Sequence, residues 1–403
     1  MSVRVREARI ENKLKDTTKS APLVGTPKIE DKMKYTIAVI PGDGIGPEVT
    51  EQAKKALNAV ADVYDHTFIY KEASMGACAI DAIGNPLPDK TLKVCEKSDA
   101  ILFGAIGHPK YDNDPTAKVR PEQGLLRLRK ELGLFCNVRP VKAYAQLIEN
   151  SPLKREIIEG TDISIYRELT GGIYFGIKEL SDDGQIAFDG CSYTVEEIER
   201  IAHLAFKEAQ TRRKKLTLVD KANVLETSRL WRKTVTALAA QYPDVALDFL
   251  FVDNAAMQMI LNPKQFDVIL TENLFGDIIS DEASVIGGSI GLLASASVGK
   301  ENALFEPIHG SFPQATGKNI ANPLASILSA AMLLNHLGLH KEAKAIENAV
   351  QKSLSLEITT EDLNKNQPFS TSKVGDFIAD YIENQDDSIL NFKNIHMGQS
   401  TII

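Results

Sequence analysis

The sequence predicts an α/β protein built on a largely parallel or mixed β-sheet. From residue 35 onward, short apolar runs rich in β-branched residues alternate with segments whose apolar residues recur at helical spacing. Several of these runs end in polar residues, which is typical of parallel strands whose carboxyl ends carry the chemistry. At 403 residues the chain is longer than a single hydrophobic core usually supports, so we expect two lobes.

The composition narrows the class of protein. Hydrophobic residues make up 43% of the chain, as in an ordinary globular protein, and the formal net charge of −8 argues against nucleic-acid binding by the whole surface. The longest uncharged stretches, 283–299 and 319–340, are rich in Gly and Ser or broken by Pro and Asn, so we expect no membrane span. Four cysteines without a C-x-x-C pair favour a reduced, cytoplasmic location.

The first 33 residues differ from the rest of the chain. They carry mixed charges, no apolar core of a signal peptide and no helical stripe. We expect residues 1–33 to be a disordered arm; an upstream-start artefact and a weak targeting peptide are the alternatives. The acidic residues Glu7, Glu11 and Asp16 count against a targeting peptide.

The first expected strand, from Thr36 to Ile40, leads into the glycine-rich segment "GDGIGPEV". A strand, a glycine turn and a helix form the context of a dinucleotide-binding fingerprint. The spacing does not fit, because the third glycine follows the second after two residues instead of three. In a Rossmann fold Asp43 would also face the pyrophosphate of the cofactor. We therefore predict a tight strand-to-helix turn and not a Rossmann fold.

The later elements repeat this strand and helix alternation. Pro47 lies in the first turn of the expected helix that follows the glycine segment. Buried strands are expected in 99–107, 215–223 and 266–277, and a buried helix in 322–334, capped by Asn322.

Two carboxylates four residues apart indicate a metal site. If "NLFGDIISDEAS" is helical, Asp277 and Asp281 lie on one face and repel each other unless a cation lies between them. A hard divalent ion such as Mg²⁺ uses such carboxylates together with water and substrate oxygens. Asp253 also ends an apolar run. The alternative is a solvated acidic face, which the apolar surroundings disfavour.

Three arginines and two further polar residues are candidates for substrate binding and catalysis. Arg129, Arg139 and Arg167 lie in or beside apolar stretches, where forked hydrogen bonds to a dicarboxylate would stabilise them. Structural ion pairs are the alternative for each arginine. Tyr174 follows a Gly-Gly turn, and Lys221 follows a strand directly; either is a candidate acid or base or an ordinary surface residue.

Several motifs occur in a fixed order along the chain: "GDGIGPEV", "GLLRLRKELGLFCNVRP", "RELTGGIYFG", "VDKANVLETSRLWR", "NLFGDIISDEAS", "GLLASASVG" and "EPIHGSFPQATGKNIANP". Together they resemble the β-hydroxyacid oxidative decarboxylases, the family of isopropylmalate, isocitrate, homoisocitrate and tartrate dehydrogenases. The resemblance implies a two-lobed fold of that family, with a cofactor-binding lobe of residues 34–134 and 287–403. Residues 135–286 would form the dimerisation, metal and substrate lobe.

The resemblance also implies roles for individual residues. Tyr174 and Lys221 match the acid/base pair, and the metal-binding acids match Asp253, Asp277 and Asp281. The positions that face the substrate match Arg129, Arg139, Arg167, Asp253, Glu122, Leu125 and Leu126. Those that bind the cofactor match Glu306, His309, Gly310, Ser311, Gln314 and Asn322. Because the lysine and one acid enter each site from the partner subunit in this family, a homodimer with shared active sites is implied.

The implied activity is NAD-dependent oxidative decarboxylation of (2R,3S)-3-isopropylmalate to 4-methyl-2-oxopentanoate with Mg²⁺ or Mn²⁺, a step of leucine biosynthesis. Leu125 and Leu126 suit an isopropyl group, where isocitrate dehydrogenases carry polar residues. Gln314 stands where many relatives carry an Asp that binds the ribose of NAD. The alternatives are a sibling enzyme acting on homoisocitrate, isocitrate or tartrate, and a non-catalytic regulatory subunit.

Overall fold

The computed structural model describes residues 33–114 and 116–384. The described residues from 34 onward form one compact unit. Apart from Met33, the predicted disordered arm of residues 1–33 lies outside the described residues. Within the described residues, the first lobe comprises 34–134 and 287–384, and the second lobe comprises 135–286; these boundaries remain a prediction.

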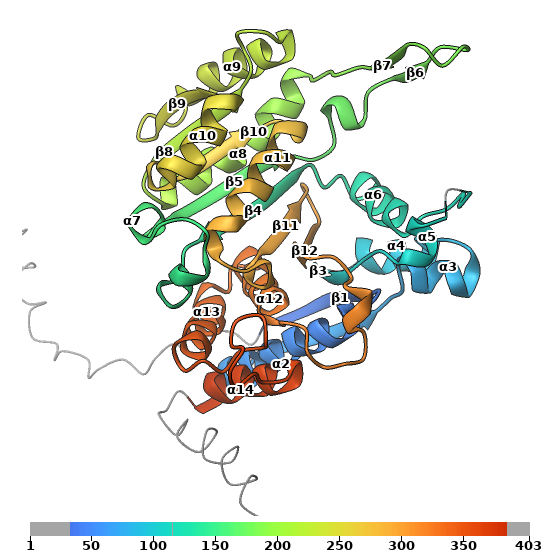
Figure 1. Cartoon of the computed structure of the whole chain (residues 1–403), viewed down its shortest axis with the longest axis vertical. Helices are drawn as coiled ribbons and strands as arrows, with labels where there is room; N and C mark the ends of the chain where they lie inside the picture. The colour runs from blue at the N-terminus through green and yellow to red at the C-terminus, as the bar shows by residue number, and fades with distance from the viewer. Residues whose placement is uncertain (1–32, 115, 385–403) are drawn as a thin grey trace, which may run out of the picture. The chain divides into compact units, whose positions relative to one another are not determined.

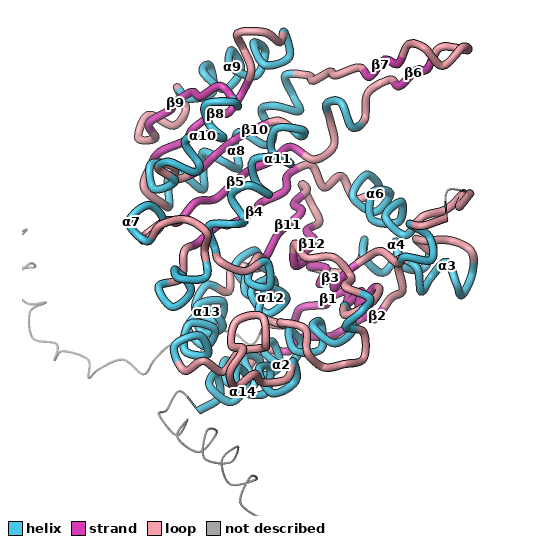
Figure 2. The backbone as a smooth tube through the Cα atoms, in the orientation of Figure 1, coloured by secondary structure: helices cyan, strands magenta, loops and turns pink. Residues whose placement is uncertain are grey.

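One ten-stranded sheet runs through both lobes (Figures 1 and 2). Its strands lie in the order β2 (Thr67–Glu72), β1 (Lys34–Gly42), β3 (Ala100–Ala105), β12 (Ala303–Pro307), β11 (Ala294–Val298), β4 (Cys136–Lys142), β5 (Asp162–Glu168), β10 (Val268–Thr271), β8 (Lys215–Asp220) and β9 (Ala246–Phe251). Neighbours are parallel at both ends, whereas β11 is antiparallel to β12 and to β4, and β4 is antiparallel to β5. The predicted α/β class with a mixed sheet is confirmed, and the strand order is not that of a Rossmann fold.

Strand alternation in the first lobe buries apolar residues on both faces of the sheet. Ile37 and Val39 of β1 pack towards α2 (Gly46–Tyr64), α12 (Leu324–His336), α13 (His340–Ser355) and α14 (Thr371–Asn384). Ala38 and Ile40 pack towards α4 (Asp89–Glu96) and α6 (Pro121–Glu131), on the face that also carries α3 (Ala77–Ile83) and the short α5 (Pro109–Asp112). The expected buried helix is α12, most of whose residues are inaccessible to solvent.

The second lobe follows the same rule. Val268 and Leu270 of β10 face α8 (Val195–Thr211) and α9 (Glu226–Ala239), whereas Ile269 faces α10 (Val252–Leu261) and α11 (Asn273–Ser284). The lobe also contains α7 (Arg155–Ile158) and a two-stranded hairpin, β6 (Lys178–Leu180) and β7 (Ala187–Asp189), which projects from its end (Figure 1). Short 3₁₀ turns are η1 (Ala145–Asn150), η2 (Gly172–Tyr174), η3 (Pro263–Gln265), η4 (Val285–Gly287), η5 (Ile290–Leu292) and η6 (Pro313–Ala315).

No helix within 33–114 and 116–384 has the length and apolar character that a membrane crossing requires.

Candidate active site

The glycine segment after β1 holds two loops in place. Asp43, which is buried, accepts hydrogen bonds from the backbone amides of Ala77, Cys78 and Gly107 at 2.9–3.0 Å. The amide of Ile45 donates to the carbonyl of Ser311 at 2.8 Å. The Asp43 carboxylate thus forms its hydrogen bonds within the protein, and its negative charge is a physical reason why this turn does not bind a pyrophosphate.

Gly44 explains why this turn needs glycine. Its φ of +60° is in the left-handed region, and a side chain there would collide with the backbone of Ser311. This close approach joins the glycine segment to the loop that follows β12, the predicted cofactor-binding loop.

That loop is also tied to α2. Glu48, in the first turn of α2, accepts hydrogen bonds from the backbone amides of Gly317 and Asn319, the latter at 3.1 Å. Gln314 is exposed in η6, Gly310 is exposed and Ser311 is buried. The loop therefore presents an ordered edge with an exposed amide side chain.

His309 lies in the same loop with one ring nitrogen uncommitted. Its Nδ1 lies 3.0 Å from the carbonyl oxygen of Gly310, whereas the buried Nε2 has no hydrogen-bond partner among the described residues. Burial lowers the pKa of His309, so the ring is neutral at neutral pH. A buried ring nitrogen without a partner fits contact with a bound ligand.

Asn322 is occupied by structural contacts. Its side-chain oxygen accepts from the amide of Leu324 at 3.0 Å, where α12 begins, and its nitrogen donates to Asp362 at 3.0 Å. Pro323 is the residue at the N-cap of α12, and Asn322, one residue before it, satisfies the first amide of the helix as a capping side chain does. These bonds use the groups that a cofactor would need, and the cofactor contact of Asn322 remains a prediction.

Arg139 and Arg167 come from adjacent strands, β4 and β5, and each meets one acid of α11. Arg139 donates to Asp281 at 2.5 Å, to Ser280 at 2.8 Å and to Asn137 at 2.9 Å. Arg167 pairs with Asp277. The negative charges of Asp277 and Asp281 are thus each compensated by an arginine of the same chain.

The Arg167 guanidinium is nearly inaccessible, with a side chain 8% exposed. Both its Nε and its Nη2 donate to the Asn273 side-chain oxygen, at 3.1 and 2.9 Å. Burial lowers the pKa of Arg167, and the charge of Asp277 opposes that effect. This arginine is therefore held rigidly at the start of α11.

Arg129 belongs to the other wall. It lies on α6 and donates to Glu306 of β12 at 2.7 Å, while its Nε is buried without a partner among the described residues. A cavity of about 180 Å³ lies beside this pair; it is also lined by Arg139, Leu125, Ser295 and His309. The cavity brings together two of the three predicted arginines and part of the predicted cofactor loop.

Tyr174 completes the cluster on the second lobe. Its hydroxyl donates to Asp277 at 2.7 Å, and its ring lies 5.7 Å from the Arg167 guanidinium carbon. Burial, followed by the hydrogen bond to Asp277, raises the pKa of Tyr174, so its hydroxyl holds a proton at neutral pH. The side chain is 42% exposed, which leaves it accessible to a substrate.

Lys221 and Asp253 form a separate pair. The Lys221 ammonium lies 2.7 Å from Asp253 Oδ1, and the hydrogen bond from Lys221 lowers the pKa of Asp253. No hydrogen bond or ion pair between described residues links this pair to Tyr174 or to Asp277. Within 33–114 and 116–384, no three metal-ligating side chains come together, so one chain does not unite Asp253 with Asp277 and Asp281.

The three predicted specificity positions lie on α6 and differ in exposure. Leu125 is 9% exposed and belongs to the core beneath β1 and β3, at the edge of the cavity, whereas Leu126 is 49% exposed. The carboxylate of Glu122 lies against Gly107, where a β-carbon would be 2.9 Å from its oxygen.

The sequence reasoning missed the polar residues that hold this machinery in place. Asn273 and Ser280 orient the two arginines of the second lobe. Glu168, fully buried, accepts from the amides of Thr170 and Gly171 and thereby fixes the turn before Tyr174. Their position in the sequence could have identified two of them, because Glu168 and Asn273 lie at or just beyond the carboxyl end of a strand.

Comparisons with known proteins agree with this geometry. The family model described as isocitrate/isopropylmalate dehydrogenase matches residues 36–378. A 3-isopropylmalate dehydrogenase of Bacteroides fragilis is 53% identical over 352 residues, 87% of this chain and 99% of the relative. The 3-isopropylmalate dehydrogenase of Bacillus subtilis is 51% identical over 347 residues, covering 85% and 95%.

Solved structures share the fold. The isocitrate dehydrogenase of Methylococcus capsulatus superposes with a TM-score of 0.77 at 34% identity, over 87% of this chain and 100% of that one. The apo form of a β-decarboxylating dehydrogenase from Thermococcus kodakarensis gives a TM-score of 0.74 at 37% identity, over 87% and 96%.

Proposed function

Because the chain belongs to the isocitrate/isopropylmalate dehydrogenase family, we propose that it oxidises and decarboxylates 3-isopropylmalate to 4-methyl-2-oxopentanoate. It is an oxidoreductase, and this reaction is a step of leucine biosynthesis. The observation that carries the proposal is the paired arrangement of Arg139 with Asp281 and Arg167 with Asp277, between the central strands β4 and β5 and the helix α11. This arrangement offers two cationic and two anionic groups to one small ligand and one cation.

The ion pairs explain how such a site binds its ligands. A dicarboxylate substrate takes over the arginines, and the acids that are released bind a divalent cation. Either ligand alone would leave partly buried charges without compensation, which is unfavourable. Substrate and metal are therefore expected to bind with positive cooperativity.

The donor set of Asp277, Asp281 and a third acid, Asp253, suits Mg²⁺ or Mn²⁺ because all three are hard oxygen ligands. When bound, the metal would supply Lewis-acid stabilisation of negative charge on the substrate oxygens, and the nicotinamide cofactor would supply the hydride acceptor. Lys221 assists removal of the proton from the 2-hydroxyl of the substrate. Tyr174 is the proton donor to carbon after loss of CO₂; its raised pKa keeps the proton on the hydroxyl until that step.

We propose that the cofactor binds in the cleft of the first lobe. The uncommitted Nε2 of His309 and the exposed side chain of Gln314 are the groups that support this placement, with Glu306, Gly310, Ser311 and Asn322 around them. An amide side chain hydrogen-bonds a ribose hydroxyl but does not attract a 2′-phosphate, so NAD is favoured over NADP.

A homodimer with shared sites is the proposed assembly. Among the described residues no hydrogen bond or ion pair joins Lys221 and Asp253 to the Tyr174 cluster of the same chain, and in the proposed dimer a second copy would bring its own pair to that cluster. Apolar residues of the β6–β7 hairpin support this, because Ile177, Leu180, Ile186 and Phe188 are 55–70% exposed. Exposed apolar surface of this kind marks protein–protein contact.

One assay tests the reaction. The protein is expected to oxidise 3-isopropylmalate with NAD and Mg²⁺, and to turn over isocitrate and malate far more slowly, because Leu125 and Leu126 offer apolar surface to an isopropyl group. Homoisocitrate, isocitrate or tartrate as the better substrate would replace the proposal by a sibling specificity. Inactivity with all of them would favour a regulatory subunit, which the presence of Tyr174, Lys221 and all three acids disfavours.

A further inference from the structure

A second cleft lies on the opposite face of the central sheet. It has a volume of about 360 Å³ and is lined by Pro140 and Lys142 of β4 and by Ala294 of β11. The neighbours Arg139 and Ser295 line the cavity of the active site. Because side chains of a strand alternate between faces, the two cavities share β4 and β11 but lie back to back.

The back cleft is bounded by both lobes. On one side α12 and α13 contribute Leu328, Met332 and Gln351, and on the other side Asp162 and Arg212 belong to the second lobe. β4 and β11 form the floor and are hydrogen-bonded to each other, one from each lobe. A rotation of the lobes about these strands that narrows one cavity widens the other.

The lining of the back cleft combines an apolar wall with charged groups. The wall consists of the aliphatic residues Leu292, Leu293, Leu328, Ala331 and Met332. Two of the cations are neutralised, because Arg212 pairs with Asp162 at 2.6 Å and Lys344 pairs with Glu347 at 3.0 Å. Lys142 thus supplies a positive charge that these pairs do not cancel.

Three donors at the cleft stay uncommitted. The Lys142 ammonium, the Tyr144 hydroxyl and the Gln351 amide have no hydrogen-bond or ion-pair partner in the part of the chain that the structure describes, although Lys142 lies 5.8 Å over the Tyr144 ring. Burial, followed by the charges of Glu347 and Asp162, raises the pKa of Tyr144, so its hydroxyl stays protonated. Three hydrogen-bond donors beside an apolar wall suit a small ligand that has a carboxylate group and a short apolar tail.

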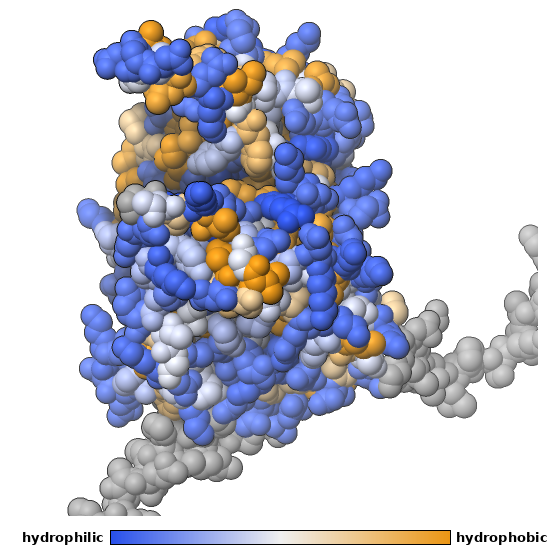
Figure 3. Space-filling view, turned by 90° about the vertical axis from the view of Figure 1, so that its right-hand side faces the viewer, coloured by the Kyte–Doolittle hydropathy of each residue, from blue (hydrophilic) through white to orange (hydrophobic). Residues whose placement is uncertain are grey.

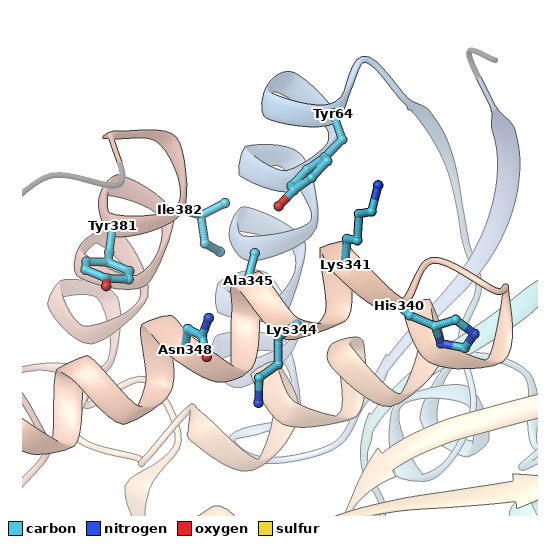
Figure 4. Close-up of a pocket in the computed structure, with 8 residues that line it drawn as sticks. All are labelled: Tyr64, His340, Lys341, Lys344, Ala345, Asn348, Tyr381 and Ile382. Carbon is cyan, nitrogen blue, oxygen red and sulfur yellow. The ribbon is translucent and has the colours of Figure 1, made fainter. Parts of the chain in front are cut away.

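Another cavity, of about 640 Å³, does not meet these conditions. It lies between α2, α13 and α14, and all of its lining residues belong to the first lobe (Figure 4). Figure 4 shows Lys344 pointing away from Tyr64 and Ile382. Because this cavity touches one lobe only, a ligand there would not respond to a rotation of the lobes.

We propose that the back cleft binds a small monocarboxylate with a branched aliphatic tail, and that the bound ligand hinders closure of the active-site cleft. The carboxylate accepts hydrogen bonds from Lys142, Tyr144 and Gln351, and the tail covers Leu328 and Met332. A ligand that fits the open back cleft favours one arrangement of the lobes over the other, which is the requirement for coupling between two sites. The binding claim stands independently of the reaction that the active site performs.

Calorimetric titration with 4-methylpentanoate tests the binding. The native protein is expected to bind it, and Lys142→Met is expected to weaken binding at least about tenfold, the loss of one charge-assisted hydrogen bond. Gln351→Leu should weaken binding less. Lys341→Met, which alters a lysine of α13 that lines only the other cavity, is the matched control and should bind like the native protein. Melting temperatures verify that each variant is folded.

Two results would overturn the proposal. The first is no binding by the native protein up to the solubility limit. The second is binding that Arg139→Met abolishes and Lys142→Met leaves intact, since the ligand would then occupy the active site.

Coupling is measured separately by kinetics with saturating substrate. The ligand is expected to lower kcat of the native protein and to have no effect on Lys142→Met, whose kcat without ligand should be native. An unchanged kcat of the native protein with the ligand bound would remove the coupling, and failure of the proposed reaction would leave the calorimetric result valid.

Discussion

The two lobes are built alike but differ in what they leave exposed. The first lobe encloses its core between β1 and β3 and helices on both faces, and α12 is buried almost throughout. Among the described residues, thirteen of the twenty exposed large apolar side chains lie in the second lobe. Figure 3 shows one face of the molecule, on which apolar residues appear in the upper and middle parts and the lower part is mainly hydrophilic. The larger share of exposed apolar side chains in the second lobe is the reason why we propose the subunit contact there.

The two lobes also differ in how their predicted site residues pair with one another. In the first lobe, Arg129 and Glu306 pair with each other beside the cavity. In the second lobe, Tyr174 and Asp277 lie together, whereas Lys221 and Asp253 lie apart from them in the same chain. Under the proposed shared site, the second lobe of one chain would supply Tyr174 and Asp277, and the second lobe of its partner would supply Lys221 and Asp253.

The largest effect is expected from breaking the shared site. Tyr174→Phe and Lys221→Met should each lose most activity, by about 10²- to 10⁴-fold, the usual worth of a positioned acid or base. If Lys221 serves the partner's site, refolding the two variants together gives mixed dimers with one intact site. About half of the dimers are mixed, so activity should approach a quarter of native.

The control is each variant refolded alone, which should stay inactive. A mixture that remains as inactive as its parents, although mixed dimers are demonstrated by mass spectrometry, would place both residues in the site of one chain.

A smaller but still large effect is expected at the metal-binding acids. Asp277→Asn should raise the Mg²⁺ concentration for half-maximal activity by more than the roughly 10- to 100-fold typical of changes around metal ligands. The variant should also lose about 1–3 kcal/mol of unfolding free energy, because Arg167 is buried and loses its counter-charge.

Asp248→Asn is the matched control, since Asp248 pairs with Lys215 at 3.6 Å on the surface. It should leave both the metal requirement and the stability unchanged. An unaltered Mg²⁺ requirement of Asp277→Asn would exclude Asp277 as a ligand.

Local patterns in the sequence predicted the α/β class, the buried helix α12 and the capping role of Asn322, because each depends on neighbouring residues. The antiparallel pairing of β11 with β4 was not predicted, since it joins segments more than a hundred residues apart in the sequence. Sequence spacing predicted that Asp277 and Asp281 need a nearby cation, but it did not show that arginines of this chain lie beside them. Their partners, Arg167 and Arg139, come from strands that only the tertiary fold brings to α11.

Substitutions of two neighbouring leucines of the first lobe, Leu125 and Leu126, are expected to have moderate but different effects on stability and on substrate discrimination. Leu125→Ser should cost about 3–5 kcal/mol of unfolding free energy, because Leu125 is part of the core. Leu126→Ser should change stability by no more than about 0.5 kcal/mol and should reduce discrimination for the isopropyl group by about 1–3 kcal/mol. Urea unfolding and kcat/KM for 3-isopropylmalate and isocitrate measure the two quantities. Native discrimination in Leu126→Ser would show that this side chain does not meet the substrate.

The smallest expected effect is the pH dependence that His309 adds to the first lobe. Burial lowers the pKa of His309 in the folded protein, whereas the unfolded chain takes up a proton near the ordinary pKa of 6.5. Below that pH the unfolded state binds more protons at this position, so the free energy of unfolding falls as the pH drops through the interval below about 6.5. His309→Gln should remove this part of the slope, about 1 kcal/mol or less. His340→Gln alters an exposed histidine and serves as the control in urea unfolding at several pH values. An identical pH slope in His309→Gln and in the native protein would mean that burial of this ring does not control its charge.

The same variants connect stability with function. If the buried Nε2 contacts the cofactor, NAD should protect native His309 from protonation, and His309→Gln should bind NAD more weakly.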